Sequence, residues 1–231
     1  MAERPAHRKR GKKTMMNRGL TETCPADIIL VARAAARAVE RHRDQRRPDP
    51  FSTPYANHLC ETAELTAELG GDVVSVCAAW LHDVIEDRCP DEATVEAERK
   101  WIREALAPRG DEILAVVAGL TDPPEWSGLP KERRKELQAE KIRGKDRRTR
   151  LVKICDQISN ARATAIASPK GWMAKKTKAY LLGCEKVVAA AGEGIEDAAS
   201  LFRKAASEAF LRLDEEEREE RNSSATRGRE R

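Results

Sequence analysis

The sequence lacks the features that mark membrane proteins, secreted proteins and disulfide-rich scaffolds. No apolar run approaches the roughly 18 residues of a membrane span, and residues 1–20 are basic without the apolar centre of a secretory signal. The six cysteines show no CxxC spacing, and most fall in apolar helical segments, which favours buried, reduced thiols over a zinc or disulfide framework. We therefore expect a cytoplasmic protein without a membrane partner.

Aromatic residues are also scarce, at 4% of the chain, whereas 40% of the residues are hydrophobic. The apolar segments contain few Gly or Pro and are rich in Ala, Leu, Glu and Arg, which favour helices over sheets. At 231 residues the chain is long enough for one packed domain. We expect an all-α domain over residues 21–212, with a disordered basic arm over 1–20 and a disordered acidic to mixed-charge tail over 213–231.

The net charge of +4 is small, but the charges are unevenly distributed. Basic residues are concentrated in the arm and in residues 131–153, and residues 214–220 are almost entirely acidic. A basic arm can bind nucleic-acid phosphates without sequence preference. Solvated tails of this composition more often have no such role, so we expect no nucleic-acid partner.

Residues 73–87 form the most informative stretch. The sequence VVSVCAAWLHDVIED predicts one apolar helix that ends in His82, Asp83, Glu86 and Asp87. If the helix continues through Asp87, two i,i+4 pairs bring an imidazole and three carboxylates together, which suits a divalent cation. A His-Asp dipeptide also arises by chance, so this interpretation needs support from other segments.

Two further helices supply that support. His58 falls in the first turn of a predicted helix, where the alternative is a capping or packed histidine. Asp156 borders the apolar face of another, with Asn160 one turn later, and here the alternative is an ion pair with Lys153 or Arg162. Two His and two Asp leave coordination positions open, which suits Mn²⁺, Fe²⁺, Co²⁺ or Zn²⁺ acting on a phosphate ester.

Helical periodicity and Pro or Gly boundaries predict further helices in the remainder of the chain. The expected helices span residues 25–39, 54–69, 91–106, 112–120, 129–142, 151–167, 172–191 and 195–213. Residues 143–150, RGKDRRTR, are expected to form a loop before the helix that carries Asp156.

Several motifs, in this order, resemble the hydrolase domain of the RelA/SpoT homologues. They are HRDQRRPDPFSTPYANH, AAWLHDVIED, GLTD, LPKERRKELQ and LVKICDQISNAR, within residues 25–210. The resemblance is strongest to the stand-alone small alarmone hydrolases, which include the animal SpoT homologue. It implies an all-helical HD-domain phosphohydrolase with a Mn²⁺ site. It also implies hydrolysis of the 3′-pyrophosphate of guanosine tetra- or pentaphosphate (ppGpp or pppGpp) to GDP or GTP and pyrophosphate.

The resemblance also implies roles for individual residues. The family's metal ligands correspond to His58, His82, Asp83 and Asp156. The acidic pair that orients and deprotonates the attacking water corresponds to Glu86 and Asp87. Residues that contact the substrate correspond to Arg47 for the purine, Asn160 for the nucleoside and Lys131 for the pyrophosphate.

Two departures from the family pattern concern the substrate rather than the reaction type. Pro48 stands where the family often has Lys, and Ala163 stands where long members often have Thr. One alternative is therefore another nucleotide phosphatase, such as one that removes the 2′-phosphate of NADPH. Another is a non-catalytic, antitoxin-like partner of an alarmone synthetase, although the complete ligand set and the intact Glu86-Asp87 pair favour catalysis.

Overall fold

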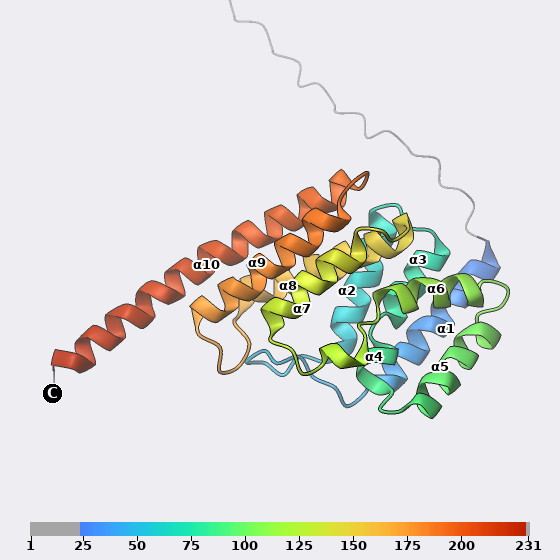
Figure 1. Cartoon of the computed structure of the whole chain (residues 1–231), viewed down its shortest axis with the longest axis horizontal. Coiled ribbons are helices and arrows are strands. Elements are labelled where there is room, and N and C mark those ends of the chain that lie inside the picture. The colour runs from blue at the N-terminus through green and yellow to red at the C-terminus, as the bar shows by residue number, and fades with distance from the viewer. Residues whose placement is uncertain (1–23, 230–231) are drawn as a thin grey trace, which may run out of the picture.

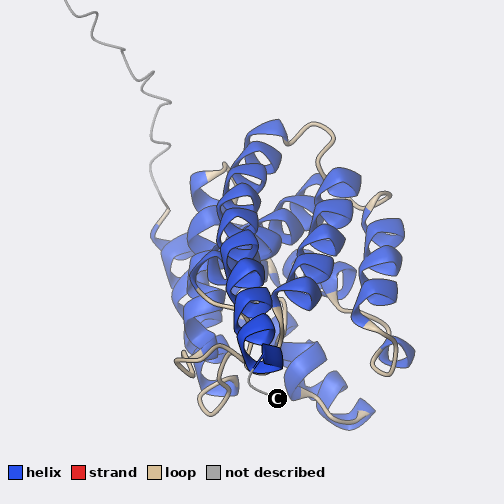
Figure 2. Ribbon diagram, turned by 90° about the vertical axis from the view of Figure 1, so that its left-hand side faces the viewer, coloured by secondary structure: helices blue, strands red, loops and turns tan. Residues whose placement is uncertain are grey.

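The computed structural model describes residues 24–229, with side chains described through residue 222. It contains ten α-helices and one 3₁₀ helix, η1 (Figure 1). They are α1 (Pro25–Arg41), α2 (Tyr55–Glu68), α3 (Val73–Leu81), α4 (Val84–Arg88), α5 (Glu92–Ala105), α6 (Gly110–Leu120), η1 (Pro124–Trp126), α7 (Lys131–Ile142), α8 (Arg147–Ile166), α9 (Ala174–Ala191) and α10 (Glu196–Arg229). No β-strand occurs within these residues (Figure 2), which confirms the all-α prediction. The expected basic arm, 1–20, lies outside the described range.

Helix α8 lies between two apolar clusters. Its residue Val152 packs into the cluster formed by α1 to α6, whereas Ile154 and Ile158 pack into the cluster formed with α9 and α10. All three side chains are fully buried, and α8 contacts α2, α3, α6, α9 and α10. Because α8 is shared, polar side chains at its border face α2 and the end of α3, where the other predicted ligands lie.

The predicted helix over residues 73–87 is interrupted, which corrects the sequence interpretation. Asp72 caps α3 by accepting a 3.0 Å hydrogen bond from Ser75 N, and α3 ends at Leu81. The ring of His82 donates from Nδ1 to the Ala79 carbonyl at 2.8 Å, the acceptor that the Asp83 amide would use in a continuous helix. A short helix, α4, then restarts after Asp83.

The expected loop over residues 143–150 is also shorter than predicted. Asp146 caps α8 by accepting a 3.1 Å hydrogen bond from Thr149 N, and α8 begins at Arg147. An Asp at this position satisfies amides that would otherwise lack a partner. The sequence prediction placed the start of this helix too late because the basic run RRTR was assigned to the loop.

Helix α10 continues past residue 212, where the sequence was expected to become disordered. Lys178 of α9 lies 2.6 Å from Asp214 and also pairs with Glu217. Arg212 pairs with Glu216 at 2.7 Å, and the amide of Ala174 donates to Glu220. The acidic segment is therefore joined to α9 by ion pairs, and α10 is helical to Arg229.

None of the helices in the described range is long and apolar enough to cross a bilayer. The cysteines are free thiols, as expected. Only Cys77, Cys155 and Cys184 are buried, whereas Cys24 and Cys60 are exposed.

Candidate metal centre

Three of the predicted ligands converge from three separate elements. His58 lies on the first turn of α2, His82 follows α3 and Asp156 lies on α8. One ligand atom from each lies within 4.8 Å of the others, and His58 Nε2 is 3.5 Å from Asp156 Oδ1. All three residues are buried. Groups of this kind are costly to bury unless they are paired or bind a cation.

The fourth predicted ligand, Asp83, lies beside both imidazoles. Its Oδ2 is 2.9 Å from His82 Nε2 and 3.8 Å from His58 Nε2. The hydroxyl of Tyr55 donates to the same oxygen at 2.7 Å. The interruption between α3 and α4 thus leaves the Asp83 carboxylate at the two ring nitrogens.

Hydrogen bonds at Nδ1 orient both imidazoles. His82 Nδ1 donates to the Ala79 carbonyl, and His58 Nδ1 donates to Ser159 Oγ at 2.8 Å. The Ser159 hydroxyl in turn donates to Glu61 Oε2 at 2.7 Å, so its oxygen is left to accept. This assignment, inferred from the partners, directs both Nε2 atoms toward the carboxylates.

The environment of the Nε2 atoms fits a cation. His82 Nε2 is buried without a well-aligned hydrogen-bond partner, although Asp83 Oδ2 is close by. Two imidazole nitrogens and two carboxylates form a mixed ligand set suited to a divalent transition metal. The residues present therefore fit a metal ion.

The carboxylates beside the two imidazoles also favour a cation. Burial, together with Arg47 and His82, lowers the pKa of His58 to about 3. Burial opposes the charged form of His82, but Asp83 outweighs it and raises the pKa of His82 to about 9. A metal ligand must be unprotonated, so a divalent ion would bind by displacing the proton that this raised pKa favours on His82.

The side chains of the acidic pair accept hydrogen bonds from residues outside α4. Glu86 Oε2 accepts a 2.9 Å hydrogen bond from the Asp122 amide, and Asp87 Oδ2 accepts one of 2.7 Å from Gln45 Nε2. Both side chains are exposed. The surrounding protein nevertheless partly desolvates the Glu86 carboxylate, and Asp83 and Asp122 add negative charge nearby. Together these effects raise the pKa of Glu86 to about 7.

Arg47 and Asn160 are in direct contact beside the metal centre. Arg47 Nη2 donates to Asn160 Oδ1 at 2.8 Å, and Asn160 Nδ2 donates to Asp156 Oδ1 at 2.7 Å. The loop that carries Arg47 is closed by a 2.8 Å hydrogen bond from its amide to the Thr53 carbonyl. Two of the predicted substrate contacts are thus connected to a candidate ligand.

Small cavities flank Arg47. One of about 180 Å³ extends to His58 and Glu61, and another of about 170 Å³ is lined by Asn160 and Lys131 among others. Lys131 Nζ lies 4.6 Å from the centre of the Trp172 ring. The structure therefore groups all three predicted substrate residues around the same space.

The alternative partner for Asp156 is also present. Lys153 Nζ lies 3.1 Å from Asp156 Oδ2, whereas Arg162 pairs with Glu61 at 2.9 Å. Burial opposes the charge of Lys153, but Asp156 outweighs it and raises the pKa of Lys153. The ion pair uses Oδ2, whereas Oδ1 faces His58, so the ion pair is present and does not exclude Asp156 as a metal ligand.

Sequence reasoning missed the residues that hold these groups in place. Gln45 and Tyr55 lie within the HRDQRRPDPFSTPYANH motif, Asp122 ends GLTD, and Ser159 precedes Asn160. In the sequence, only their position in or next to the motifs that resemble the family indicated that these residues belong to the site. Their partners lie far away in the sequence and are visible only in the fold.

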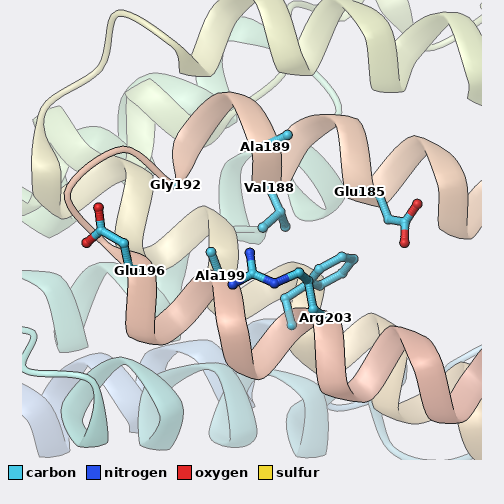
Figure 3. A pocket seen from close by; sticks show the side chains of 8 residues that line it. Glu185, Val188, Ala189, Gly192, Glu196, Ala199 and Arg203 are labelled. Atoms are coloured by element: carbon cyan, nitrogen blue, oxygen red, sulfur yellow. The ribbon is translucent and has the colours of Figure 1, made fainter.

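Other cavities carry no comparable chemistry. One of about 350 Å³ lies between α9 and α10, with Val188 and Ala199 on its walls and Glu185, Glu196 and Arg203 around it (Figure 3). Another of about 800 Å³ is lined mainly by apolar residues of α1 and α3. Neither contains a histidine, so the ligand cluster is the better candidate site.

Comparisons with known proteins agree with this choice. Residues 34–180 match the HD domain. A Xenopus tropicalis protein named guanosine-3′,5′-bis(diphosphate) 3′-pyrophosphohydrolase MESH1 is 32% identical over 165 residues, which cover 71% of this chain and 85% of that protein. The Homo sapiens protein of the same name is 34% identical with the same coverage.

A solved structure gives the same result. Its title is "A metazoan ortholog of SpoT hydrolyzes ppGpp and plays a role in starvation responses", and it matches with a TM-score of 0.59 and 27% identity. The match covers 83% of this chain and 95% of that one. Because the HD-domain match spans more than half of the sequence and the relatives are matched over most of their length, the chain belongs to the HD domain family, among the homologues of SpoT.

Proposed function

We propose that the chain hydrolyses the 3′-pyrophosphate of ppGpp or pppGpp, which yields GDP or GTP and pyrophosphate. Water attacks the phosphorus attached to the 3′ oxygen, the 3′ O–P bond breaks, and the 3′ oxygen takes up a proton. The observation that carries this proposal is the cluster of His58, His82 and Asp156 beside Arg47 and Asn160. Relatives named for this reaction support the assignment.

The metal in this proposal is Mn²⁺, held by His58, His82, Asp83 and Asp156. When bound, it would supply Lewis-acid polarisation of the phosphate. The Nδ1 contacts of both imidazoles would keep their Nε2 atoms available as ligands.

Glu86 and Asp87 are the proposed water-orienting groups. An acceptor for the proton of the attacking water works best with a pKa near the working pH, and Glu86 has a pKa of about 7. Asp87 accepts a hydrogen bond from Gln45 and would orient the water rather than accept its proton.

Arg47, Asn160 and Lys131 are the proposed substrate-binding residues. A guanidinium can stack on a purine face, and an ammonium can pair with phosphate oxygens. In support of this assignment, Arg47 donates a hydrogen bond to Asn160, which donates to the proposed ligand Asp156. The cytoplasmic location and a synthetase partner remain predictions.

A product analysis tests this function. The chelated and Mn²⁺-reloaded protein is incubated with ppGpp, pppGpp, NADPH and GTP, and pyrophosphate and orthophosphate are measured separately. We expect pyrophosphate from the guanosine 3′-pyrophosphates and little turnover of the other two. Release of orthophosphate, or a larger kcat/KM for NADPH, would contradict the proposal while leaving the metal chemistry intact.

A further inference from the structure

Asp122 connects Glu86 of the acidic pair to helix α7 through hydrogen bonds. It follows α6, is buried, and its amide donates to Glu86 Oε2 at 2.9 Å. This is the hydrogen bond that the structure gives the Glu86 carboxylate. The direction of the Asp122 amide therefore helps to set where that carboxylate points.

Helix α7 holds Asp122 by its side chain and by its neighbouring carbonyls. Gln138 Nε2 donates to Asp122 Oδ2, and Lys141 Nζ lies 3.7 Å from Asp122 Oδ1. Lys141 Nζ also donates to the carbonyls of Thr121 and Leu120. A cation at the C-terminal end of α6 is favourable because the last carbonyls of a helix lack partners within it.

These contacts form a relay from α7 to α4. Gln138 and Lys141 fix the Asp122 side chain and the end of α6, and the Asp122 amide in turn fixes Glu86. Neither α7 residue contacts Glu86 in the described structure. The relay spans 52 residues of sequence, from Glu86 to Gln138, yet consists of two hydrogen bonds.

We propose that Gln138 and Lys141 are positioning residues that act through Asp122 to hold the Glu86 carboxylate in its working orientation. The proposal rests on the proposed function for what Glu86 does in the reaction. It assigns a positioning role to α7, which lies within the basic residues 131–153. An incorrectly oriented base slows the chemical step, since reactivity falls steeply with small displacements of a catalytic group.

Several charged groups lie near the Glu86 carboxylate. The charged groups that influence Glu86 are Asp83 before α4, Asp122 after α6, Lys141 on α7 and Lys153 on α8. Replacing Gln138 changes none of these charges. Its effect on Glu86 is therefore one of orientation rather than of net charge.

The test uses Gln138→Leu, with Glu140→Leu as the matched control. Glu140 lies on α7 two residues later and is exposed. Lys141→Met is a second variant, in case Gln138→Leu does not fold. Thermal unfolding and circular dichroism establish that each protein is folded, and ppGpp turnover with Mn²⁺ then gives kcat and KM.

A second measurement needs no substrate. Pro123 and Pro124 follow Asp122 and carry no amide hydrogen, so hydrogen exchange in this segment reports Thr121 and Asp122. Loss of the Gln138 contact is expected to speed exchange at Asp122 about tenfold. The expected fall in kcat is about tenfold to a hundredfold with KM unchanged, and the control should match wild type in both readouts.

Each result decides a separate question. Unchanged exchange and unchanged kcat in folded Gln138→Leu and Lys141→Met would overturn the relay, as would an equal loss in Glu140→Leu. If wild type releases no pyrophosphate from ppGpp, the proposed function fails, but the exchange measurement still decides whether α7 holds Asp122. Faster exchange with unchanged kcat would show that the contact exists without positioning the base.

Discussion

Arg47 Nη2 donates a 2.8 Å hydrogen bond to Asn160 Oδ1 across 113 residues of sequence. Asn160 then donates to Asp156 Oδ1, so a loop after α1 is connected through α8 to the candidate metal centre. The purine-binding residue and a metal ligand implied by the family resemblance are therefore separated by one side chain.

The first prediction uses this contact. Arg47→Ala should mainly raise KM, because stacking on a base occurs in the ground state and the transition state alike. Because Arg47 and Asn160 are in contact, their effects should not add in a double-mutant cycle with Asn160→Ala. We expect a coupling of about 0.5–3 kcal/mol in kcat/KM. Additive effects would show that the two side chains act independently.

The metal centre predicts a linkage between Mn²⁺ and thermal stability. Adding Mn²⁺ at about 100 times its Kd should stabilise the chelated protein by about 2.7 kcal/mol, provided that the unfolded chain does not bind it. Asp156→Asn should lose most of this effect, whereas Asp197→Asn, which changes an exposed residue of α10, should retain it. Thermal scans at graded Mn²⁺ measure both. A Tm independent of Mn²⁺ in wild type would exclude the site.

Ser159 predicts an effect on metal affinity without a change of ligand. Its hydroxyl accepts from His58 Nδ1 and donates to Glu61. Ser159→Ala should let the imidazole reorient and weaken Mn²⁺ binding about tenfold to a hundredfold. Calorimetric titration of the chelated protein provides the measurement. Wild-type affinity in this variant would mean that packing alone holds the ring.

The acidic pair predicts a loss of rate without loss of binding. Glu86→Gln preserves shape and can still accept from the Asp122 amide, but it cannot accept a proton from water. We expect kcat to fall about 10²- to 10⁴-fold while Mn²⁺ affinity stays near wild type. Near wild-type kcat in this variant would assign Glu86 a structural role at α4.

The pKa of Glu86 predicts how kcat/KM depends on pH in the acidic range. Partial desolvation by the surrounding protein, together with Asp83 and Asp122, raises this pKa to about 7. A base is active only when deprotonated, so kcat/KM should fall as pH decreases through the pKa. A bound cation favours the carboxylate, which places the midpoint at or below about pH 7. Asp122→Asn removes a negative charge and should move the midpoint lower. A midpoint well above pH 7, or one unmoved by Asp122→Asn, would argue against Glu86 as the base.

The sequence alone determined the helical class and the residue types of the site. The apolar stripe of α8 and the cap at Asp91 are local patterns, and local patterns predict helices because backbone hydrogen bonds within a helix join near neighbours. The family resemblance supplied the candidate ligands in their sequence order. No periodicity could have placed His58 near Asp156, since their proximity depends on how α2 packs against α8.

Only the tertiary structure decided the local geometry of the site. Periodicity predicted one helix through Asp87, but the His82 ring takes the Ala79 carbonyl and interrupts it. The relay through Asp122 was likewise not predictable, because Gln138 and Glu86 are far apart in the sequence and are connected only through Asp122 in the folded chain. Side chains that compete with the backbone, and contacts between distant segments, depend on three-dimensional packing, which a one-dimensional pattern does not contain.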